Sequence, residues 1–355
     1  MKKYAQIFSA LFLVLFLPGC DFIQIVSPEL IPSSENAYFT ESGRLFVVGG
    51  KNLYEVISLN GAYSSRVELE GSIGGYDCHF NGMTAHGETI YALCSSTSGE
   101  PIAKPSDYTE SEIENIAHEG GEGLFEMIAG LFGMELPKVS FLVRINLKET
   151  GPHRVQYSEI SKGGGVFFPN GITTDGVGNI YITNFLAFIS NEPAILKVKV
   201  EDEENFIISE EPFLQRPYGI EPNGIQLDGD VLYYVSGNNL FRIDINDDGS
   251  ADHVVSIYST FPTNVFDDFI IGPDGIALTE LNMVTILHPL AAANKIILFK
   301  RGGNSFKKYR SAVCQKELRP SSIALPPGDT ILNGDLYITD FFGGGIYKRN
   351  HSRVQ

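Results

Sequence analysis

Tryptophan is absent from this 355-residue sequence, which removes one common platform for stacking a sugar ring, although 16 tyrosines remain. The four cysteines show no Cys-x-x-Cys spacing, and this excludes the usual zinc and thioredoxin-type motifs. No Gly-x-Ser-x-Gly motif occurs, which excludes the serine nucleophile elbow of α/β-hydrolases. Any catalysis must therefore use a site without a paired reactive cysteine or a serine elbow.

Basic residues are scarce, because 26 Lys and Arg stand against 43 Asp and Glu, and the formal net charge is −17. Basic residues nowhere follow one another in a run of more than two along the chain. An acidic surface repels phosphate backbones and anionic lipid headgroups. Nucleic acid is therefore not expected as a partner.

Long apolar runs are missing after the N-terminus, where no segment could span a bilayer. Two lysines, Lys2 and Lys3, precede a short apolar run over residues 7–17, which is typical of an export signal. The run ends in Leu-Pro-Gly-Cys, which resembles a bacterial lipobox with Cys20 as its cysteine. The alternative is an ordinary cleaved signal followed by an incidental cysteine.

The lipobox resemblance implies that residues 1–19 are a lipoprotein signal peptide and that Cys20 carries the lipid. Residues 20–34 then tether an exported domain to the periplasmic or extracellular face of a bacterial cell membrane. Export permits disulfides, and Cys78, Cys94 and Cys314 remain in the mature chain. Cys78 and Cys94 flank a predicted hairpin, so they are the better pair.

The chain repeats itself with a period of about fifty residues, as propellers do. Each repeat reads as a short strand, a turn with Gly or Asp, and a second strand rich in Tyr, Val and Ile. Four-stranded blades around a channel fit this pattern, so the sequence predicts an all-β, six-bladed β-propeller over residues 35–355. An eight-stranded sandwich is the structural alternative. The repeats begin at Glu35, Asn81, Asn170, Asn223, Asp274 and Ser321.

Two departures from the period have their own interpretations. Only three strands follow Ser321, so the outer strand of the last blade is expected from residues 22–27. Residues 99–138 interrupt blade 2 and have a helical apolar pattern. We expect this helical insertion to form a lid with an apolar wall for the pocket; the alternative is a helix packed on the propeller rim.

The first residue of each innermost strand should lie beside the central channel. Glu35, Asn81, Asn170, Asn223 and Asp274 would then form a ring of side-chain oxygens. Carboxylate and amide oxygens are the ligands that Ca²⁺ prefers, whereas zinc prefers sulfur and imidazole. The alternative is that Asn-Gly serves only as a favoured turn pair.

These residues also carry a family resemblance. The chain resembles the regucalcin–gluconolactonase (senescence marker protein) group of Ca²⁺-dependent six-bladed propellers, with paraoxonase-like features. Glu35 in "ENAYF", Asn170 in "FPNGI" and Asp274 in "GPDGIAL" match the metal ligands of that group. Asn223 matches a further asparagine ligand of paraoxonases, and Asn81 a substrate- or metal-facing asparagine of gluconolactonases.

The resemblance implies Ca²⁺-dependent hydrolysis of a small-molecule lactone or ester, with Ca²⁺ held by Glu35, Asn170, Asn223 and Asp274. Asn81 would donate a hydrogen bond to the substrate or complete the metal shell. Asp274 and His288, which resembles a paraoxonase pocket histidine in "ILHP", are the candidates for the general base. The second hypothesis is a non-catalytic propeller lipoprotein that uses Ca²⁺ structurally and binds a protein or glycan.

Overall fold

The computed structural model describes most of the chain between residues 21 and 351. The ranges not described inside those limits are 60–61, 71, 98–136, 149–152, 161–166, 188–191, 220, 262–263, 283–293, 304, 315–317 and 341–342. Three expectations therefore lie outside the described residues: the signal peptide with Cys20, nearly all of the helical insertion, and His288. No helix among the described residues has the length and apolar character needed to cross a membrane.

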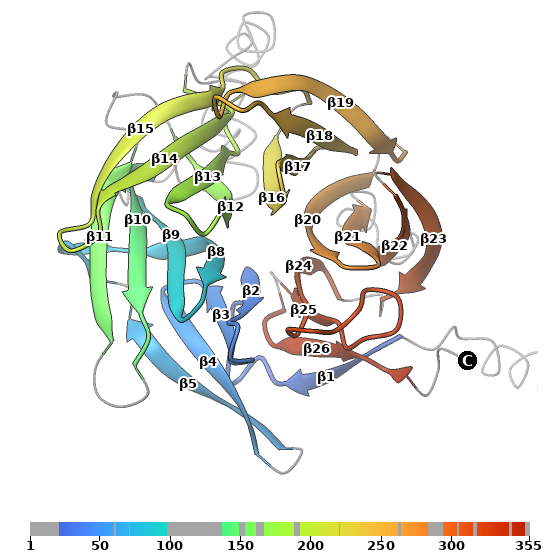
Figure 1. The fold of residues 1–355 in the computed structure, drawn as a ribbon. Coiled ribbons are helices and arrows are strands. Elements are labelled where there is room, and N and C mark those ends of the chain that lie inside the picture. Colours follow the sequence, from blue (N-terminus) through green and yellow to red (C-terminus); the bar gives the residue numbers. More distant parts are fainter. Residues whose placement is uncertain are drawn as a thin grey trace, which may run out of the picture.

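The described chain forms six four-stranded antiparallel sheets arranged around an axis, so the fold is a six-bladed β-propeller (Figure 1). Blade 1 contains β2 (Asn36–Phe39), β3 (Leu45–Gly49), β4 (Asn52–Leu59) and β5 (Ala62–Glu70). Blade 2 contains β8 (His79–His86), β9 (Thr89–Thr97), β10 (Pro137–Asn146) and β11 (Arg154–Ile160). Blade 3 contains β12 (Pro169–Thr174), β13 (Asn179–Asn184), β14 (Ile195–Asp202) and β15 (Ile207–Leu214).

In every blade the strands lie in the order named from the axis outward, and the other three blades follow the same pattern (Figure 1). Blade 4 contains β16 (Pro222–Asp228), β17 (Val231–Ser236), β18 (Asn239–Ile245) and β19 (Ala251–Ser259). Blade 5 contains β20 (Asn264–Gly272), β21 (Gly275–Asn282), β22 (Lys295–Gly302) and β23 (Ser305–Val313). Blade 6 contains β24 (Pro320–Ala324), β25 (Tyr337–Asp340), β26 (Ile346–Arg349) and β1 (Phe22–Val26). A separate small ribbon of β6 (Ser72–Ile73) and β7 (Tyr76–Asp77) precedes blade 2.

The N-terminal strand closes the ring where the sequence predicted it. β1 pairs antiparallel with β26, and Phe22 lies opposite Arg349 at one end of the pairing. Phe22 is fully buried in the core between blades 5 and 6. The first strand of the chain is therefore part of the last blade, and this pairing covers the edge that β26 would otherwise present.

Six apolar cores lie between neighbouring blades, because strand side chains alternate between the two faces of each sheet. In β9, for example, Ala92 and Cys94 pack toward blade 1, and Leu93 packs toward blade 3. The remaining four interfaces are built in the same way around the ring. The packing between blades therefore holds the innermost strands in a fixed position around the axis.

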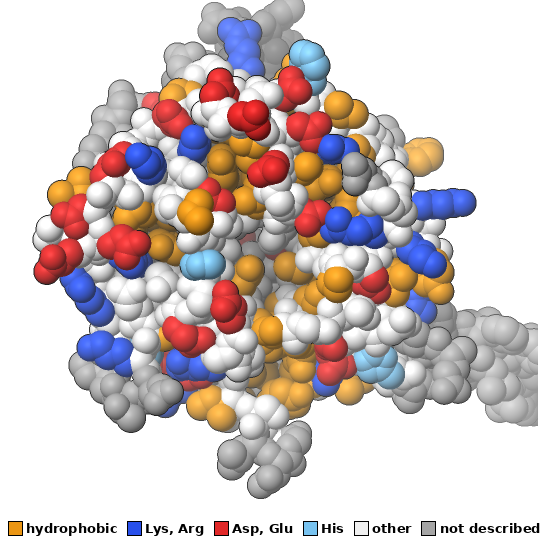
Figure 2. Space-filling view, in the orientation of Figure 1, with side chains coloured by type: hydrophobic (Ala, Val, Ile, Leu, Met, Phe, Trp, Pro, Cys, Tyr) orange, Lys and Arg blue, Asp and Glu red, His pale blue; other side chains and the backbone are white. Residues whose placement is uncertain are grey.

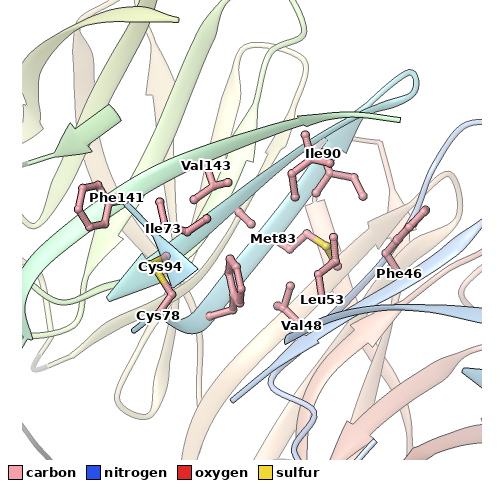
Figure 3. Close-up of a cluster of buried hydrophobic side chains, with 13 residues drawn as sticks. Phe46, Val48, Leu53, Ile73, Cys78, Met83, Ile90, Cys94, Phe141 and Val143 are labelled. Carbon is pink, nitrogen blue, oxygen red and sulfur yellow. A yellow bond between two sulfur atoms is a disulfide. The ribbon is translucent and has the colours of Figure 1, made fainter. Parts of the chain in front are cut away.

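Cys78 and Cys94 form a disulfide inside the core between blades 1 and 2, with their Cα atoms 5.4 Å apart (Figure 3). Both residues are fully buried, and the labelled side chains around them include Ile73 and Phe141. The disulfide ties the segment that enters β8 to the neighbouring strand β9. Cys314 is buried and takes no part in this disulfide.

The expected placement of Asp274 at the start of an innermost strand is wrong. The innermost strand of blade 5 is β20, and Asp274 lies in the turn between β20 and β21, where Gly272 and Gly275 face each other. The motif "GPDGIAL" has an Asp-Gly pair that resembles the Asn-Gly pairs of blades 2, 3 and 4, but it follows an innermost strand instead of lying near the start of one. The fifth repeat therefore begins about seven residues earlier than the motif alignment placed it.

Candidate functional site: an oxygen-lined ring at the propeller axis

A shared irregularity in the innermost strands creates the site. The pairing of innermost and second strand shifts register in blades 2 to 6, between Phe80 and Met83 in blade 2 for example. Two consecutive residues lie in each break, as in a β-bulge, which re-aims side chains. The residue pairs are Asn81-Gly82, Asn170-Gly171, Asn223-Gly224, Asp267-Asp268 and Ser321-Ser322, and Glu35-Asn36 takes the equivalent place at the start of blade 1.

The glycines in three of these pairs are required by close contact between blades. A Cβ atom on Gly82 would lie 2.0 Å from the carbonyl oxygen of Asn170, and one on Gly171 would lie 2.4 Å from that of Asn223. In blades 3, 4 and 5 the backbone at the ring residue therefore passes directly against the glycine of the preceding blade. This contact explains why the chain repeats Asn-Gly in blades 2, 3 and 4.

A threonine on the second strand fastens neighbouring blades at the same level. The Thr183 hydroxyl accepts the Gly171 N–H at 2.7 Å and donates to the Asn223 carbonyl oxygen at 2.6 Å. In blade 6, the Thr339 hydroxyl accepts the Ser322 N–H at 2.9 Å and donates to the Glu35 carbonyl oxygen at 3.2 Å. Backbone groups freed by the bulges thus find partners, which buried polar groups need.

The other three blades replace the glycine with polar side chains that bond to one another. The Ser322 hydroxyl donates to Asp268 Oδ2 at 2.6 Å, and Asn36 Nδ2 donates to the same oxygen at 3.3 Å. Asn36 Nδ2 also lies 3.1 Å from Ser322 Oγ. Asn36 Oδ1 is buried without a hydrogen-bond partner in the described part of the chain. This cluster is therefore rich in oxygen atoms and includes one unsatisfied acceptor.

The first residues of the six pairs surround a small void on the axis. The void measures about 10 Å³, which is close to the space that a single water molecule or ion requires. Three of the residues that line it carry carboxylates, namely Glu35 from blade 1 and the adjacent Asp267 and Asp268 from blade 5. The lining residues are Glu35, Asn36, Asn81, Asn170, Gly171, Asn223, Gly224, Asp267, Asp268 and Ser321.

Hydrogen bonds fix the orientation of two amides in the ring. Asn81 Nδ2 donates to Ser95 Oγ at 3.1 Å and to the Pro169 carbonyl oxygen at 3.0 Å. Asn223 Nδ2 donates to Asp267 Oδ1 at 2.6 Å. Because the nitrogen of each amide is engaged, its Oδ1 is the atom available to a ligand.

The carboxylates of the site are held in an environment that disfavours their charge. Burial raises the pKa of Asp267 to about 6, although hydrogen bonds from Ser321 and Asn223 offset part of the effect. Burial raises the pKa of Asp268 to about 7. Burial, and then repulsion from Asp267 and Asp268, raises the pKa of Glu35 well above its usual range. A bound cation would offset the repulsion between these enclosed carboxylates and would stabilise their charged forms.

The donor set suits a hard cation. No three His, Cys, Asp or Glu side chains in the described part of the chain come together as a metal group, so a metal here must also use amide oxygens. Glu35 and Asp267 supply carboxylate oxygens, and Asn81, Asn170 and Asn223 supply amide oxygens. An all-oxygen set of this kind fits Ca²⁺ and does not fit zinc.

Four of the five predicted ring residues line the void, namely Glu35, Asn81, Asn170 and Asn223. Asp274 does not, because its carboxylate accepts the backbone N–H groups of Ile331 at 2.6 Å and Leu332 at 3.1 Å in blade 6. The sequence interpretation missed the ring residues Asp267 and Ser321, of which Asp267 is the acidic one. Two adjacent acids within the apolar segment "NVFDDFIIG" were the available signal.

No protein-family model matches the sequence, and no curated protein matches it significantly. Solved structures of other proteins do match this chain in fold. The soluble aldose sugar dehydrogenase of Escherichia coli in the apo form superposes with a TM-score of 0.52 at 11% identity, over 92% of this chain and 98% of that one. A putative oxidoreductase (glucose dehydrogenase) of Thermus thermophilus superposes with a TM-score of 0.51 at 14% sequence identity. The match covers 93% of this chain and 99% of that one. At these identities the similarity shows a propeller fold alone.

Proposed function

We propose that the axial ring binds one Ca²⁺ ion through Glu35, Asn170, Asn223 and Asp267, with Asn81 completing the set. The observation that carries this proposal is the enclosed group of carboxylates, whose pKa values are raised and which meet no positive side chain among the described residues of the ring. The oriented amide oxygens of Asn81 and Asn223 support it, since both amide nitrogens are already bonded elsewhere. Asp267 takes the place that the family resemblance gave to Asp274.

The reaction that we propose for this site is hydrolysis of a lactone or a related ester. Bound Ca²⁺ would supply a Lewis acid that polarises a substrate carbonyl. The chain itself holds the ligands in fixed positions. The Thr183 hydroxyl forms hydrogen bonds with the backbone of Gly171 and Asn223, and the Asn223 amide donates a hydrogen bond to Asp267. Such preorganisation is what electrostatic catalysis requires. The resemblance of "ENAYF" and "FPNGI" to the regucalcin–gluconolactonase group supports this reaction.

A second candidate is a propeller in which Ca²⁺ only joins the blades while the rim binds a protein or glycan. The small void favours this candidate, because about 10 Å³ accommodates an ion but no part of a substrate. In the hydrolase, the substrate would approach from the face on which the ring lies. Under either candidate, the lipobox resemblance at Cys20 supports an exported protein tethered to a bacterial membrane.

The deciding experiment is a screen of lactones and aryl esters with the purified protein, in Ca²⁺ and in EGTA. We expect hydrolysis that requires Ca²⁺ and is lost in Asp267→Asn. Asp274→Asn, which alters an acid away from the axis, is the matched control and should keep the activity. Ca²⁺ binding by a protein that hydrolyses none of these compounds would reject the hydrolase and favour the structural role.

A further inference from the structure

We infer that a second cavity, at the opposite end of the innermost strands, binds a small organic cation. The cavity measures about 590 Å³, which is within the range of sites for small molecules. Figure 2 looks along the axis and shows the centre of the ring hollowed, with acidic, histidine and apolar side chains around it. The ends of the innermost strands and the turns that follow them contribute to the cavity in blades 1, 2, 3, 5 and 6; among its residues are Tyr38, Glu41, His86, Asp175, Pro273 and Asp329.

The cavity carries negative charge that the described chain does not neutralise. Glu41, Asp175 and Asp329 come from three different blades, and no Lys or Arg is among the described residues that line it. The nearby arginines are engaged with other acids: Arg44 lies 2.7 Å from Glu55, and Arg301 lies 2.7 Å from Asp228. Within the described ranges, none of the three carboxylates forms an ion pair.

Backbone hydrogen bonds hold these carboxylates in place without cancelling their charge. Glu41 Oε1 accepts the Gly87 N–H at 3.3 Å, which ties blade 1 to blade 2. Asp175 Oδ1 accepts the N–H groups of Val177 and Asn179. Asp329 Oδ2 accepts an N–H at 3.0 Å from Asp335. A cationic group entering the cavity would meet fixed carboxylates, so little side-chain ordering would be required.

The rest of the wall decides between a metal ion and an organic cation. Apolar side chains from blades 5 and 6 form one side, including Ile270, Pro273 and Leu325. Tyr38 and Phe39 add aromatic surface from blade 1, and aromatic faces attract ammonium and guanidinium groups. A bare metal ion would leave these walls in contact with water, whereas an amine with an apolar body would cover them. The cavity therefore fits an amine or guanidinium compound with an apolar part.

This site is separate from the axial ring. The ring residues lie at the beginning of the innermost strands, as Asn81 does in β8, and the cavity residues lie at the end, as His86 does. No residue that the structure describes lines both sites. Binding in the cavity should therefore persist in Asp267→Asn, and failure of the proposed hydrolase would leave this inference untouched.

The test is calorimetric titration of the Ca²⁺-saturated protein with 2-phenylethylamine, with 2-phenylethanol as the neutral analogue. We expect the amine to bind and the alcohol to bind at least about tenfold more weakly. Glu41→Gln and Asp329→Asn should each weaken binding of the amine by about two- to fivefold, the range for one exposed or partly exposed charge. Asp230→Asn is the control, since Asp230 is an exposed acid in the corresponding turn of blade 4 and does not line the cavity.

Two outcomes would overturn the inference. One is the absence of amine binding by the folded wild-type protein. The other is equal binding of amine and alcohol, with Glu41→Gln and Asp329→Asn indistinguishable from Asp230→Asn, because charge would then play no part. The melting temperature of each variant shows whether it is folded.

Discussion

Asn223 Nδ2 donates a hydrogen bond of 2.6 Å to Asp267 Oδ1 and thereby joins blades 4 and 5 at the propeller axis. The bond identifies Asp267 as the acidic ring residue of blade 5. Because the amide nitrogen of Asn223 faces Asp267, the amide oxygen of Asn223 points away from Asp267 and is available to coordinate a cation.

Gly171→Ala should destabilise the protein by about 1–3 kcal/mol, the usual cost of forcing atoms into a packed region. The new Cβ would lie 2.4 Å from the Asn223 carbonyl oxygen, which is backbone and has no room to move. Urea unfolding measures the change. Gly302→Ala is the matched control, because its Cβ would meet nothing closer than 3.9 Å. Equal stability of the two variants would show that the contact between blades does not require glycine.

The metal-free protein should lose stability as the pH rises from about 4 to about 7. The folded pKa values of Asp267 (about 6) and Asp268 (about 7) lie above the usual 3.8, so the folded state binds more protons than the unfolded state across this window. A tenfold difference in proton affinity between the folded and the unfolded state corresponds to about 1.4 kcal/mol. Thermal unfolding in EGTA at several pH values measures the slope.

Asp268→Asn is the variant that checks this pH dependence, because it removes one of the three buried carboxylates with a raised pKa, Glu35, Asp267 and Asp268, while keeping a similar shape. Its melting temperature in EGTA should fall less between pH 4 and pH 7 than that of the wild type. Saturating Ca²⁺ should reverse the wild-type trend, since the ion favours charged carboxylates. A wild-type melting temperature that rises with pH in EGTA would contradict the assignment.

Replacing both Cys78 and Cys94 with Ala should cost about 3 kcal/mol beyond the loss of packing, because the disulfide closes a loop with a sequence separation of 16. Cys314→Ala measures the packing loss of a buried sulfur outside any disulfide. Chemical unfolding under non-reducing conditions compares the two. A double variant no less stable than Cys314→Ala would show that the disulfide adds nothing to the fold.

The sequence predicted the propeller well because its period follows from geometry that every blade shares. The strand pattern repeats, and Asn-Gly recurs in blades 2, 3 and 4 because the next blade lies directly against each glycine. The same reasoning failed in blade 5. There the Asp268 carboxylate accepts a hydrogen bond from the Ser322 hydroxyl of the next blade, so a polar side chain takes the place of glycine and the motif disappears.

Asp274 shows why local resemblance misled the assignment. Its Asp-Gly pair serves a tight turn between β20 and β21, and its carboxylate caps backbone N–H groups of blade 6. An Asp-Gly pair suits an axial metal ligand, and it equally suits a tight turn whose carboxylate accepts backbone N–H groups. The sequence alone does not distinguish these two roles. The long-range bond from Asn223 to Asp267 separates them, and it exists only in the folded chain.

Calorimetric Ca²⁺ titration of the metal-free protein and of two single variants, Asp267→Asn and Asp274→Asn, tests whether the axial ring is a Ca²⁺ site. We predict one Ca²⁺ bound by the wild type, at least about tenfold weaker binding by Asp267→Asn, and wild-type affinity in Asp274→Asn. The absence of Ca²⁺ binding by the folded wild type would contradict the axial site. So would a loss of Ca²⁺ affinity in Asp274→Asn while Asp267→Asn keeps the wild-type affinity.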